Sequence, residues 1–522
     1  MFFKTNRKII LNCLLLALTA IMVLCTSYFY LRKTASFRFF DEENNIVAGY
    51  LMTTGRDLYT DIFMNHNPLP IVLSAVIQKL FVINTLFELV KYHRLFMIVF
   101  ALVANILLFV RFRFKSLIFI CVYEFIKFYL SGQMFLAEGM IGYMFAYLVL
   151  LIITSLSLRL KIQKMDVLIA SLCVSFIVLS REPYIPVAFA LYMIVFYLSK
   201  SKKWFVVCAI LSISIIIGVM IQFNLGEFYK QVVLLNREMA KDEFKVQNGM
   251  QIFSGLTQLY QYVFVGLKLD KPVYIVLGLV NIVLLYLSVK NIRRVRLPYR
   301  MIVLVTALII LFLAGVRNYQ AGAEWYGMYR SIPYIAIILA SVSALALNRT
   351  TLFIIICTYL VAFIHPRSHI LEQKTNTLEY YINYSQTNQF GSVINSLCSN
   401  YPYSCSLHVD DIFVYTYWLT KKPLTYKYAF YYGVNQAYLD YKEIRRKELI
   451  YDPPTIYLDA NCNVAPVKLP VEIESDYRYL TEIDLLTNKR RQSCIAVRKE
   501  LLPYIDDKIN AELLNNQVLI NK

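Results

Sequence analysis

The sequence predicts an α-helical protein that crosses a membrane many times and carries a small α/β domain at its C-terminal end. Of its 522 residues, 58% are hydrophobic and only 17% are charged, whereas a soluble domain is about 45–50% apolar and about 25% charged. Apolar segments recur as far as Ile364, and the sequence from residue 366 onward is polar and rich in tyrosine. We therefore expect a membrane domain over residues 1–365 and a separate domain over residues 366–522.

The positions of the basic residues account for the net charge of +19. They gather in short loops between apolar segments, as expected when Lys and Arg stay on the cytoplasmic side of a membrane. A nucleic-acid site needs a basic surface interleaved with aromatic residues, and the sequence contains no such stretch. We therefore expect membrane lipids, and not nucleic acid, as partners.

The first apolar segment, residues 9–30, follows the basic residues Lys4, Arg7 and Lys8. At about 22 residues it is long enough to span a bilayer, and it lacks the small-residue site of a cleavable signal peptide. We interpret it as an uncleaved first helix with a cytoplasmic N-terminus. Residues 31–94 then form the first outer loop, and we expect its polar part to be a short loop held against the membrane surface.

A shorter apolar stretch, residues 68–84, is expected to lie on the membrane surface. The next one, residues 95–110, ends in a basic cluster at 111–115 that should be cytoplasmic. Only one crossing joins the outer loop to this cluster, so the second span begins near His93. Later spans are expected at about residues 117–130, 135–158, 167–179, 204–223, 272–289 and 350–364, with others ending near residues 200, 317 and 348, which gives about eleven in all. An amphipathic stretch at residues 227–244 is expected to form a surface helix.

The C-terminal part alternates short β-like runs with helical stretches, which predicts a small α/β domain. The β-like runs lie at residues 411–419, 454–460 and 493–499, and a helical stretch lies at residues 436–451. Four cysteines, an even set that suits an oxidising compartment, lie in this part. Three pairings of them are possible, and we favour Cys398–Cys405 and Cys462–Cys494.

Local motifs of nucleotide-dependent enzymes are absent from the sequence, which has no P-loop, no GxGxxG after a strand, no GxSxG, no HExxH and no DxD. No Cys/His spacing suggests zinc. Polar residues instead gather at the outer ends of the expected spans: Asp41, Glu42, Asp61, His66, Glu138, Arg181, Glu182, Arg317, Glu324 and Arg330. Glu138 lies near the start of a span, where an unpaired carboxylate is costly. It either extends to the membrane interface or lines a pocket.

The stretch from Asp41 to Leu69 resembles the first outer loop of the GT-C membrane glycosyltransferases. The closest resemblance is to the group that contains the protein O-mannosyltransferases and the lipid A aminoarabinose transferases. The matching residues stand in order: Asp41-Glu42, Gly55, Tyr59-Thr60-Asp61 and Asn65-His66-Asn67-Pro68-Leu69. Weaker matches are Tyr129-Leu130-Ser131 with Glu138, Ser180-Arg181-Glu182-Pro183, and the stretch from Tyr326 to Pro333, where Tyr326 takes the position of a family histidine.

This resemblance implies an activity. The family transfers a sugar from a polyprenyl-phosphate donor to an acceptor outside the cytoplasm, such as O-antigen, lipid A, another cell-surface glycan or protein. An acceptor hydroxyl attacks the anomeric carbon, and a carboxylate at the water–lipid boundary removes its proton. By resemblance Asp41 is this general base, Glu42 is the neighbouring candidate, and Glu138 orients the acceptor or a basic partner.

The leaving lipid phosphate needs cationic stabilisation. Arg181, Arg317 and Arg330 are candidates, because arginine can hold two phosphate oxygens at once. The resemblance requires no cofactor, although some relatives bind a divalent ion. It implies a cell (inner) membrane location, and the count of about eleven spans places the C-terminal domain in the periplasm or outside the cell. Further substrate-binding candidates are Tyr59, Asp61, His66 and Tyr326.

Two alternatives come from other classes. A transporter or flippase of lipid-linked saccharides predicts charged residues near the membrane midplane and repeats between halves, whereas the polar residues here gather at one face without a clear repeat. An O-antigen ligase or polymerase would have another fold, with a large loop between late spans in place of a terminal α/β domain.

Overall fold

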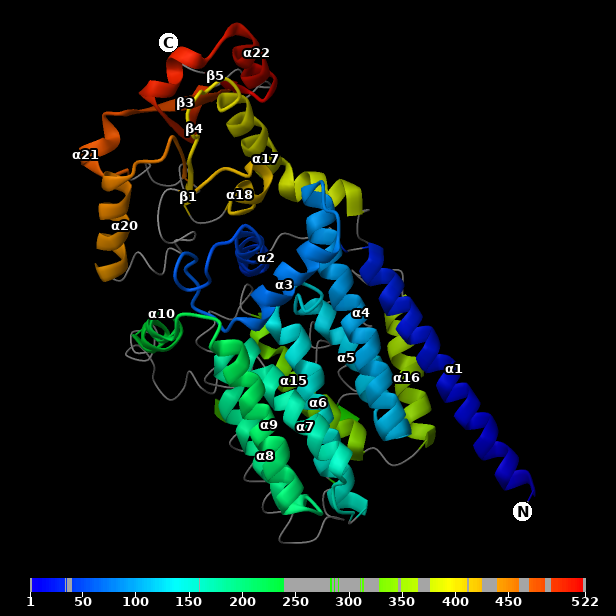
Figure 1. Cartoon of the computed structure of the whole chain (residues 1–522). Helices are drawn as coiled ribbons and strands as arrows, with labels where there is room; N and C mark the ends of the chain where they lie inside the picture. The colour runs from blue at the N-terminus through cyan, green and yellow to red at the C-terminus, as the bar shows by residue number, and fades with distance from the viewer. Residues whose placement is uncertain are drawn as a thin grey trace.

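The computed structural model describes residues 2–32, 34, 40–158, 160–238, 328–345, 349–364, 376–410, 413–424, 439–459, 469–483 and 490–519, and a few positions between 282 and 313. Over these residues the chain is mostly helical. A bundle of long helices stands below a small domain that contains a β-sheet (Figure 1). The expected span at residues 272–289 and the one ending at Arg317 lie almost wholly outside the described residues.

The bundle helices begin and end close to the expected boundaries. In the part of the chain that the structure describes, four helical segments are long and apolar enough to cross a membrane: Ile9–Arg32, Leu86–Lys115, Ala137–Leu158 and Lys202–Met220. The expected total of about eleven spans therefore stays a prediction. The bundle consists of α1 (Phe2–Arg32), α4 (Leu86–Phe112), α5 (Leu117–Tyr129), α6 (Ala137–Leu158), α7 (Lys164–Ser180), α8 (Ile185–Leu198), α9 (Lys202–Met220), α15 (Ile332–Leu345) and α16 (Arg349–Ile364).

Helix α6 is the centre of the bundle and is buried almost along its whole length. It packs against α4, α7, α8 and α15, which explains why it is apolar on all sides. A Cβ at Gly142 would overlap the hydroxyl of Tyr123 on α5, so a glycine is needed where these two helices meet. Helix α9, in contrast, exposes isoleucines such as Ile210, Ile213 and Ile217. This exposed apolar face is typical of a helix that contacts lipid.

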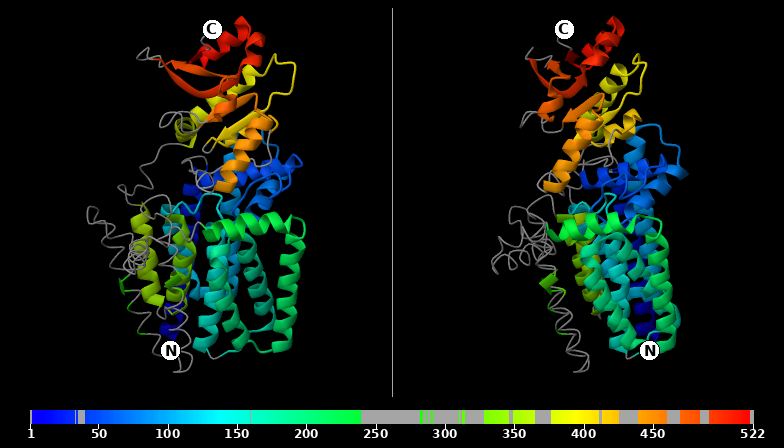
Figure 2. Two further views of the ribbon diagram at one scale, coloured as in Figure 1. Left: turned by 90° about the vertical axis from the view of Figure 1, so that its left-hand side faces the viewer. Right: turned by 60° about the vertical axis from the view of Figure 1, so that its left-hand side comes forward.

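The described basic loops lie at one end of the bundle, and the α/β domain lies at the other (Figure 2). At that end, α4 contacts the start of α7, and the connection between α6 and α7 contacts the end of α8. Arg111 binds Asp166 with Nε and Oδ1 2.5 Å apart, and the backbone N–H of Ile162 donates to the carbonyl oxygen of Leu198 at 3.1 Å. This segregation of charge is the pattern expected from the positive-inside rule.

The polar stretch that we expected to be a loop is largely helical. Helix α2 (Phe40–Thr53) and helix α3 (Leu69–Leu80) lie against each other at the end of the bundle opposite the basic loops (Figure 1). The expectation of a loop at 40–53 was wrong, because it weighed the acidic residues and not the apolar face that α2 buries with Ile46 and Val47. Carboxylates in the first turn also favour a helix N-terminus. The helix expected within residues 68–84 is confirmed.

The C-terminal domain contains a five-stranded sheet in the order β1-β2-β4-β3-β5. Strands β1 and β2 are parallel, and the other pairs are antiparallel. The strands expected at 454–460 and 493–499 and the helix expected at 436–451 are confirmed. The elements are α17 (Asn376–Leu397), β1 (Leu407–Asp410), α18 (Tyr415–Thr420), α20 (Leu439–Tyr451), β2 (Ile456–Asp459), α21 (Val471–Glu474), β3 (Tyr477–Ile483), β4 (Arg490–Arg498), α22 (Asp507–Asn515) and β5 (Val518–Leu519).

The strand expected at 411–419 was wrong, because residues 415–420 form helix α18. Tyr415, Tyr417 and Trp418 have the aromatic character of a strand, but all of them are buried, which a helix packed on several sides achieves and an alternating strand does not. The favoured disulfide Cys398–Cys405 is confirmed. Cys494 is also disulfide-bonded, and its expected partner Cys462 lies outside the described residues.

The C-terminal domain and α2 share one apolar core. Ile46 and Val47 of α2 belong to the same buried cluster as Tyr415 and Trp418 of α18. The ammonium group of Lys421 lies 3.6 Å from the centroid of the Trp418 ring and 4.4 Å from that of Tyr50 on α2. Helix α2 is thus held between the bundle and the domain (Figure 1).

An ion pair fixes the start of α2 inside this core. Glu42 is 0% exposed and Arg94 of α4 is 1% exposed. Arg94 Nε donates to Glu42 Oε1 at 3.0 Å, and Nη2 donates to Oε2 at 2.6 Å. The backbone N–H of Phe135, just before α6, donates to Glu42 Oε1 at 2.8 Å. Glu42 therefore connects α2 to two helices of the bundle.

We predict that Arg94→Met destabilises the protein strongly. It leaves the Glu42 carboxylate buried without its cation, and breaking a buried pair in this way costs about 3–5 kcal/mol. Thermal unfolding in detergent should show a clearly lower midpoint for Arg94→Met. The double variant Glu42→Gln/Arg94→Met should recover part of the loss, because the uncompensated charge is gone. A single variant as stable as the wild type would contradict a structural role for the pair.

Candidate active site

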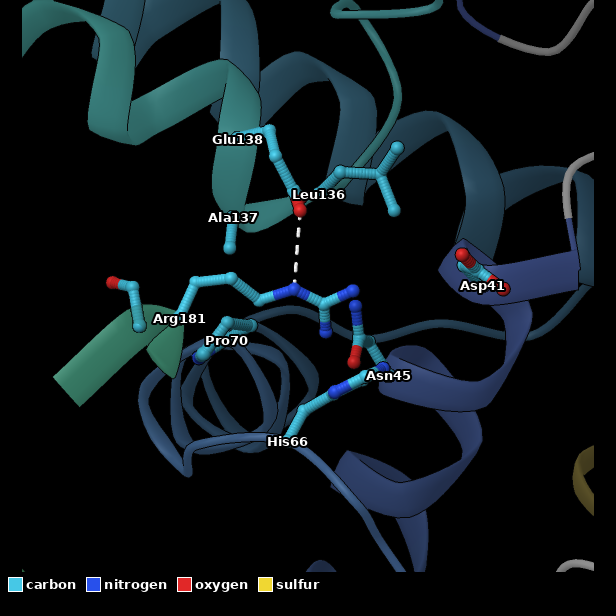
Figure 3. A pocket seen from close by; sticks show the side chains of 9 residues that line it. Asp41, Asn45, His66, Pro70, Leu136, Ala137, Glu138 and Arg181 are labelled. Atoms are coloured by element: carbon cyan, nitrogen blue, oxygen red, sulfur yellow. Dashed lines mark hydrogen bonds and ion pairs between the residues drawn. The ribbon is translucent and has the colours of Figure 1, made fainter. Parts of the chain in front are cut away.

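A pocket opens at the end of the bundle where α2, α3, α6 and α7 meet (Figure 3). Four of the residues that the sequence analysis singled out, namely Asp41, His66, Glu138 and Arg181, line it. They come from segments far apart in the chain, and the fold brings them together. The remaining lining residues are Asn45, Pro70, Leu136, Ala137 and Ser180.

Glu138 and Arg181 form an ion pair on one wall of the pocket. Arg181 Nε donates to Glu138 Oε1 at 3.1 Å, and both side chains are buried. Glu138 stands in the first turn of α6, and Arg181 follows the last residue of α7. Of the two hypotheses for Glu138, the structure agrees with the pocket residue, because the carboxylate is paired and buried instead of extending to the interface.

The guanidinium group of Arg181 reaches from the end of α7 toward Asn45 and His66 (Figure 3). Its Nε is used by Glu138, and within the described part of the chain its terminal nitrogens have no protein acceptor at hydrogen-bond distance. These donors therefore remain for an anion in the pocket. An arginine held by one nitrogen in this way can present its other N–H groups to carboxylate or phosphate oxygens.

Asp41 lies in the first turn of α2 and is half-buried. The hydroxyl of Tyr329 donates a hydrogen bond to Asp41 Oδ2, and Arg330 Nε donates to the Tyr329 oxygen at 3.2 Å. Both residues stand on the short helix Met328–Ser331, just before α15. The sequence did not predict a role for Tyr329, although this residue is adjacent to Arg330 in the stretch from Tyr326 to Pro333. A tyrosine beside an arginine, just before a helix with proline in its first turn, does not indicate a site residue unless its partner in space is known.

The adjacent carboxylates Asp41 and Glu42 point in different directions. One residue along a helix turns the side chain by about 100°. Glu42 is held by Arg94 and by the backbone of Phe135, and it does not line the pocket, whereas Asp41 does. The structure thus separates the two candidates for the base by location.

His66 lies beside Glu182 at the edge of the pocket, with Nδ1 and Oε1 3.7 Å apart. This distance is too long for a hydrogen bond, and the two groups form an ion pair only when the imidazole is protonated. Burial, together with the positive charge of Arg181, lowers the pKa of His66 below the 6.5 of a free imidazole, although Glu182 opposes the shift. The imidazole is therefore biased toward its neutral form, which can accept a proton or a hydrogen bond.

The other expected site residues lie outside the pocket wall. Tyr59 is buried, and its hydroxyl donates to the carbonyl oxygen of His66 at 2.7 Å. Asp61 accepts a hydrogen bond from the backbone N–H of Asp57 at 2.9 Å and so closes a turn. Arg330 donates to Tyr329, whose hydroxyl in turn donates to Asp41. Arg317 and Tyr326 lie outside the described residues.

Comparison of the chain with family models, with curated proteins and with solved structures finds no match. Among the residues that the structure describes, no cluster of three or more His, Cys, Asp or Glu side chains is arranged to hold a metal ion. The site is therefore interpreted from its own residues.

We predict that His66 makes the protein sensitive to acid. Because the pKa of His66 is lowered below 6.5 in the folded chain, the unfolded chain binds more protons as the pH falls below this value, and the folded state loses stability. His66→Gln removes this contribution. The fall in thermal midpoint between about pH 7.5 and about pH 5.5 should therefore be smaller in the variant than in the wild type. An equal fall in both proteins would show that the environment of His66 does not disfavour the imidazolium.

Proposed function

We propose that this chain is an integral-membrane glycosyltransferase of the GT-C type. It moves a sugar from a polyprenyl-phosphate donor to an acceptor outside the cytoplasm. The observation that supports this proposal most is the pocket, in which Asp41 and Arg181 lie at one end of an apolar helix bundle. A carboxylate and a guanidinium group are the two groups that this transfer needs, one for the proton and one for the phosphate.

The proposed reaction is a direct displacement at the anomeric carbon. The acceptor hydroxyl oxygen forms the new bond to this carbon while its proton passes to Asp41. The bond between the anomeric carbon and the phosphate oxygen breaks, and its electron pair remains on the lipid phosphate. Arg181 stabilises the additional negative charge through its terminal N–H groups. The atoms and charges balance without an oxidant, a reductant or a nucleotide.

The surrounding residues keep these two groups in position. Glu138 holds Arg181 at Nε and thereby leaves the rest of the guanidinium group for the phosphate. Tyr329 donates to Asp41 Oδ2, which holds the carboxylate in place at the pocket. Such preorganisation is a main source of catalytic rate, because the groups do not need to reorient during the reaction.

The level of the pocket agrees with a lipid-linked donor. The apolar helices of the bundle end where α2 and α3 begin, and the polar residues of the site gather at this end. The head group of a polyprenyl phosphate lies at the same kind of boundary, with its chain in the lipid. A donor of this type can therefore reach Arg181 without leaving the membrane.

A transporter or flippase of lipid-linked saccharides is the second candidate, and one observation favours it. Glu124 and Lys127 of α5 form a buried ion pair, with Oε2 and Nζ 2.7 Å apart, and Asn105 of α4 donates to Glu124 Oε1 at 2.9 Å. Charged residues inside apolar helices often mark a transport path. These charges are paired with each other, however, whereas Arg181 keeps donors for a ligand. An O-antigen ligase or polymerase, the remaining alternative, has no such observation in its favour.

We predict that Asp41→Asn abolishes most of the transfer activity while the protein folds normally. The amide keeps the size and polarity of the carboxylate but cannot take the proton, so the rate should fall roughly a hundredfold or more. The measurement compares membranes from cells that carry the variant with membranes from cells that carry the wild type. The rate of glycan modification is followed by mass spectrometry.

Two variants serve as controls for this experiment. Asp57→Asn makes the same chemical change at an exposed position of the same outer segment and should leave the rate unchanged. Glu42→Gln should reduce the rate less than Asp41→Asn. Normal transfer in Asp41→Asn with an inactive Glu42→Gln would move the base to Glu42. Normal transfer in both variants would remove this segment from the chemistry.

We further propose that the N-terminus is cytoplasmic and that the C-terminal domain lies in the periplasm or outside the cell, with about eleven spans in total. An impermeant thiol reagent added to cells with an opened outer envelope should label Tyr403→Cys, which replaces a residue that is 69% exposed in the C-terminal domain. It should label Lys203→Cys, in the first turn of α9 beside the basic loop, only after the membrane is permeabilised. The reverse pattern would invert the proposed topology.

A further inference from the structure

We propose that residues 225–238, here called the surface helix, rest on the lipid head groups and position His66 through Gln231 and Tyr59. The surface helix comprises α10 (Leu225–Phe228), the π-helical turn Tyr229–Leu234 and the helical residues 235–238. Figure 2 shows it lying across the end of the bundle instead of along it. Packing and exposure alone support this position on the membrane. Any effect of the surface helix on sugar transfer, through His66, rests on the proposed function.

One face of the surface helix is turned away from the protein and is apolar. Leu225, Tyr229 and Val233 on this face are exposed, and Lys230 beside them is exposed too. An exposed face that combines large apolar residues with a basic residue is typical of a helix lying in the membrane interface. Polar residues would be expected there if the face contacted water.

The exposed face is continuous with a surface that contacts lipid. Helix α9, which is long and apolar enough to cross a membrane, exposes Ile213 and Ile217, and Ile221 just after its end is exposed too. Only a few residues separate Ile221 from Leu225, so the two apolar surfaces adjoin. The occupant of the exposed face is therefore the head-group region of the same bilayer that surrounds α9.

The opposite face of the surface helix holds the segment that carries His66. Gln231 is fully buried; its Nε2 donates to the carbonyl oxygen of Tyr59 at 2.7 Å, and its Oε1 accepts from the backbone N–H of Met64 at 3.0 Å. Asn236 Nδ2 donates to the carbonyl oxygen of Asn65 at 2.8 Å. A single glutamine thus closes the turn between Tyr59 and Met64 from outside.

Tyr59 connects the surface helix to His66, which lines the pocket. Its ring packs edge-on against Phe223 and Phe228, with centroids 5.7 and 5.1 Å apart, and its hydroxyl donates to the carbonyl oxygen of His66 at 2.7 Å. Tyr59 also has a φ of 70°, a left-handed conformation that is unfavourable for a residue with a side chain. Surrounding contacts must maintain such a conformation, and the surface helix supplies several of them.

A π-helical turn at this place supports the assignment. The residues of the turn, Tyr229–Leu234, include both Tyr229 on the exposed face and Gln231 on the buried face. Turns of this kind are frequent at functional positions of helices, where the extra residue redirects side chains. Here it lets one short segment present an apolar residue outward and an amide inward.

The lipid contact is tested with two matched tyrosine variants in nanodiscs made with acyl-chain-brominated phosphatidylcholine. Bromine on the acyl chains quenches the fluorescence of a nearby tryptophan. Tyr229→Trp places a tryptophan on the surface helix, where the tyrosine is 51% exposed, and Tyr403→Trp places one in the C-terminal domain, where the tyrosine is 69% exposed. The emission added by Tyr229→Trp should be mostly lost relative to unbrominated lipid, and that added by Tyr403→Trp should be retained. Full emission from both variants would overturn the lipid contact.

The positioning role is tested by hydrogen–deuterium exchange of the same nanodisc-embedded chain. Gln231→Leu removes both hydrogen bonds, and the amides of residues 59–64 should exchange roughly tenfold faster, the scale of one lost hydrogen bond. Gln222→Leu is the control, because this glutamine is exposed and its side chain donates to the carbonyl oxygen of Gly218 in α9, away from residues 59–64; it should leave the exchange unchanged. Unchanged exchange in Gln231→Leu would overturn the positioning role.

Fast exchange of the amides in α6 and β4 would show that Gln231→Leu does not fold. In that case a milder variant, Gln231→Glu, tests the same role. Gln231→Glu keeps an oxygen for Met64 but has no donor for Tyr59, so faster exchange should be confined to the turn at residues 59–64. Exchange at the wild-type rate in this variant would also overturn the proposal. These measurements need no sugar transfer: if they succeed and Asp41→Asn has no effect on glycans, the surface helix stands and the proposed function falls.

Discussion

The buried ion pair between Glu42 and Arg94 is the constraint on which the rest of the site depends. Two charges removed from water are tolerated only when they are paired and their remaining hydrogen-bonding groups are satisfied. Here the pair, with the backbone N–H of Phe135, meets that condition. It fixes the first turn of α2 against α4 and against the start of α6. Asp41, one residue earlier, is thereby held at the pocket instead of moving with a free loop.

A second ion pair, between Glu138 and Arg181, joins α6 to the end of α7, as the first joins α2 to α4. The difference lies in how completely each arginine is used. Arg94 is engaged by Glu42 through two nitrogens, whereas Arg181 gives only its Nε to Glu138. A fully engaged arginine is structural, and a partly engaged one that faces a pocket can bind an anion. The surface helix holds the turn at residues 59–64, just before His66, through Gln231.

The positions of the bundle helices could be predicted from the sequence, because runs such as residues 135–158 are too long and too apolar for another environment. The gathering of Asp41, His66, Glu138 and Arg181 could be expected from the resemblance of short motifs, although their common pocket appears only in the structure. Helix α2 was missed because its acidic first turn concealed the apolar face that it buries. Helix α18 was missed because aromatic residues favour strands locally, while its contacts with α2 are distant in sequence.

The least predictable features are contacts between residues that are far apart in the chain. Tyr329 reaches Asp41 across 288 positions, and Gln231 reaches Tyr59 across 172. Neither residue carries a local pattern that names its partner, because a lone tyrosine or glutamine has many ordinary uses. Such contacts follow from the packing of whole helices, and no short stretch of the sequence predicts them.

The most direct test of a glycosyl transfer at this pocket compares cells with and without the protein. Mass spectrometry would follow both the surface glycans and the polyprenyl-linked lipids. If the protein transfers the sugar, cells without it should lack one sugar on a surface acceptor and accumulate the corresponding polyprenyl-phosphate sugar on the outer side of the membrane. Unchanged surface glycans, or a lipid-linked saccharide that accumulates only on the cytoplasmic side as expected for a missing transporter, would contradict the proposed transfer.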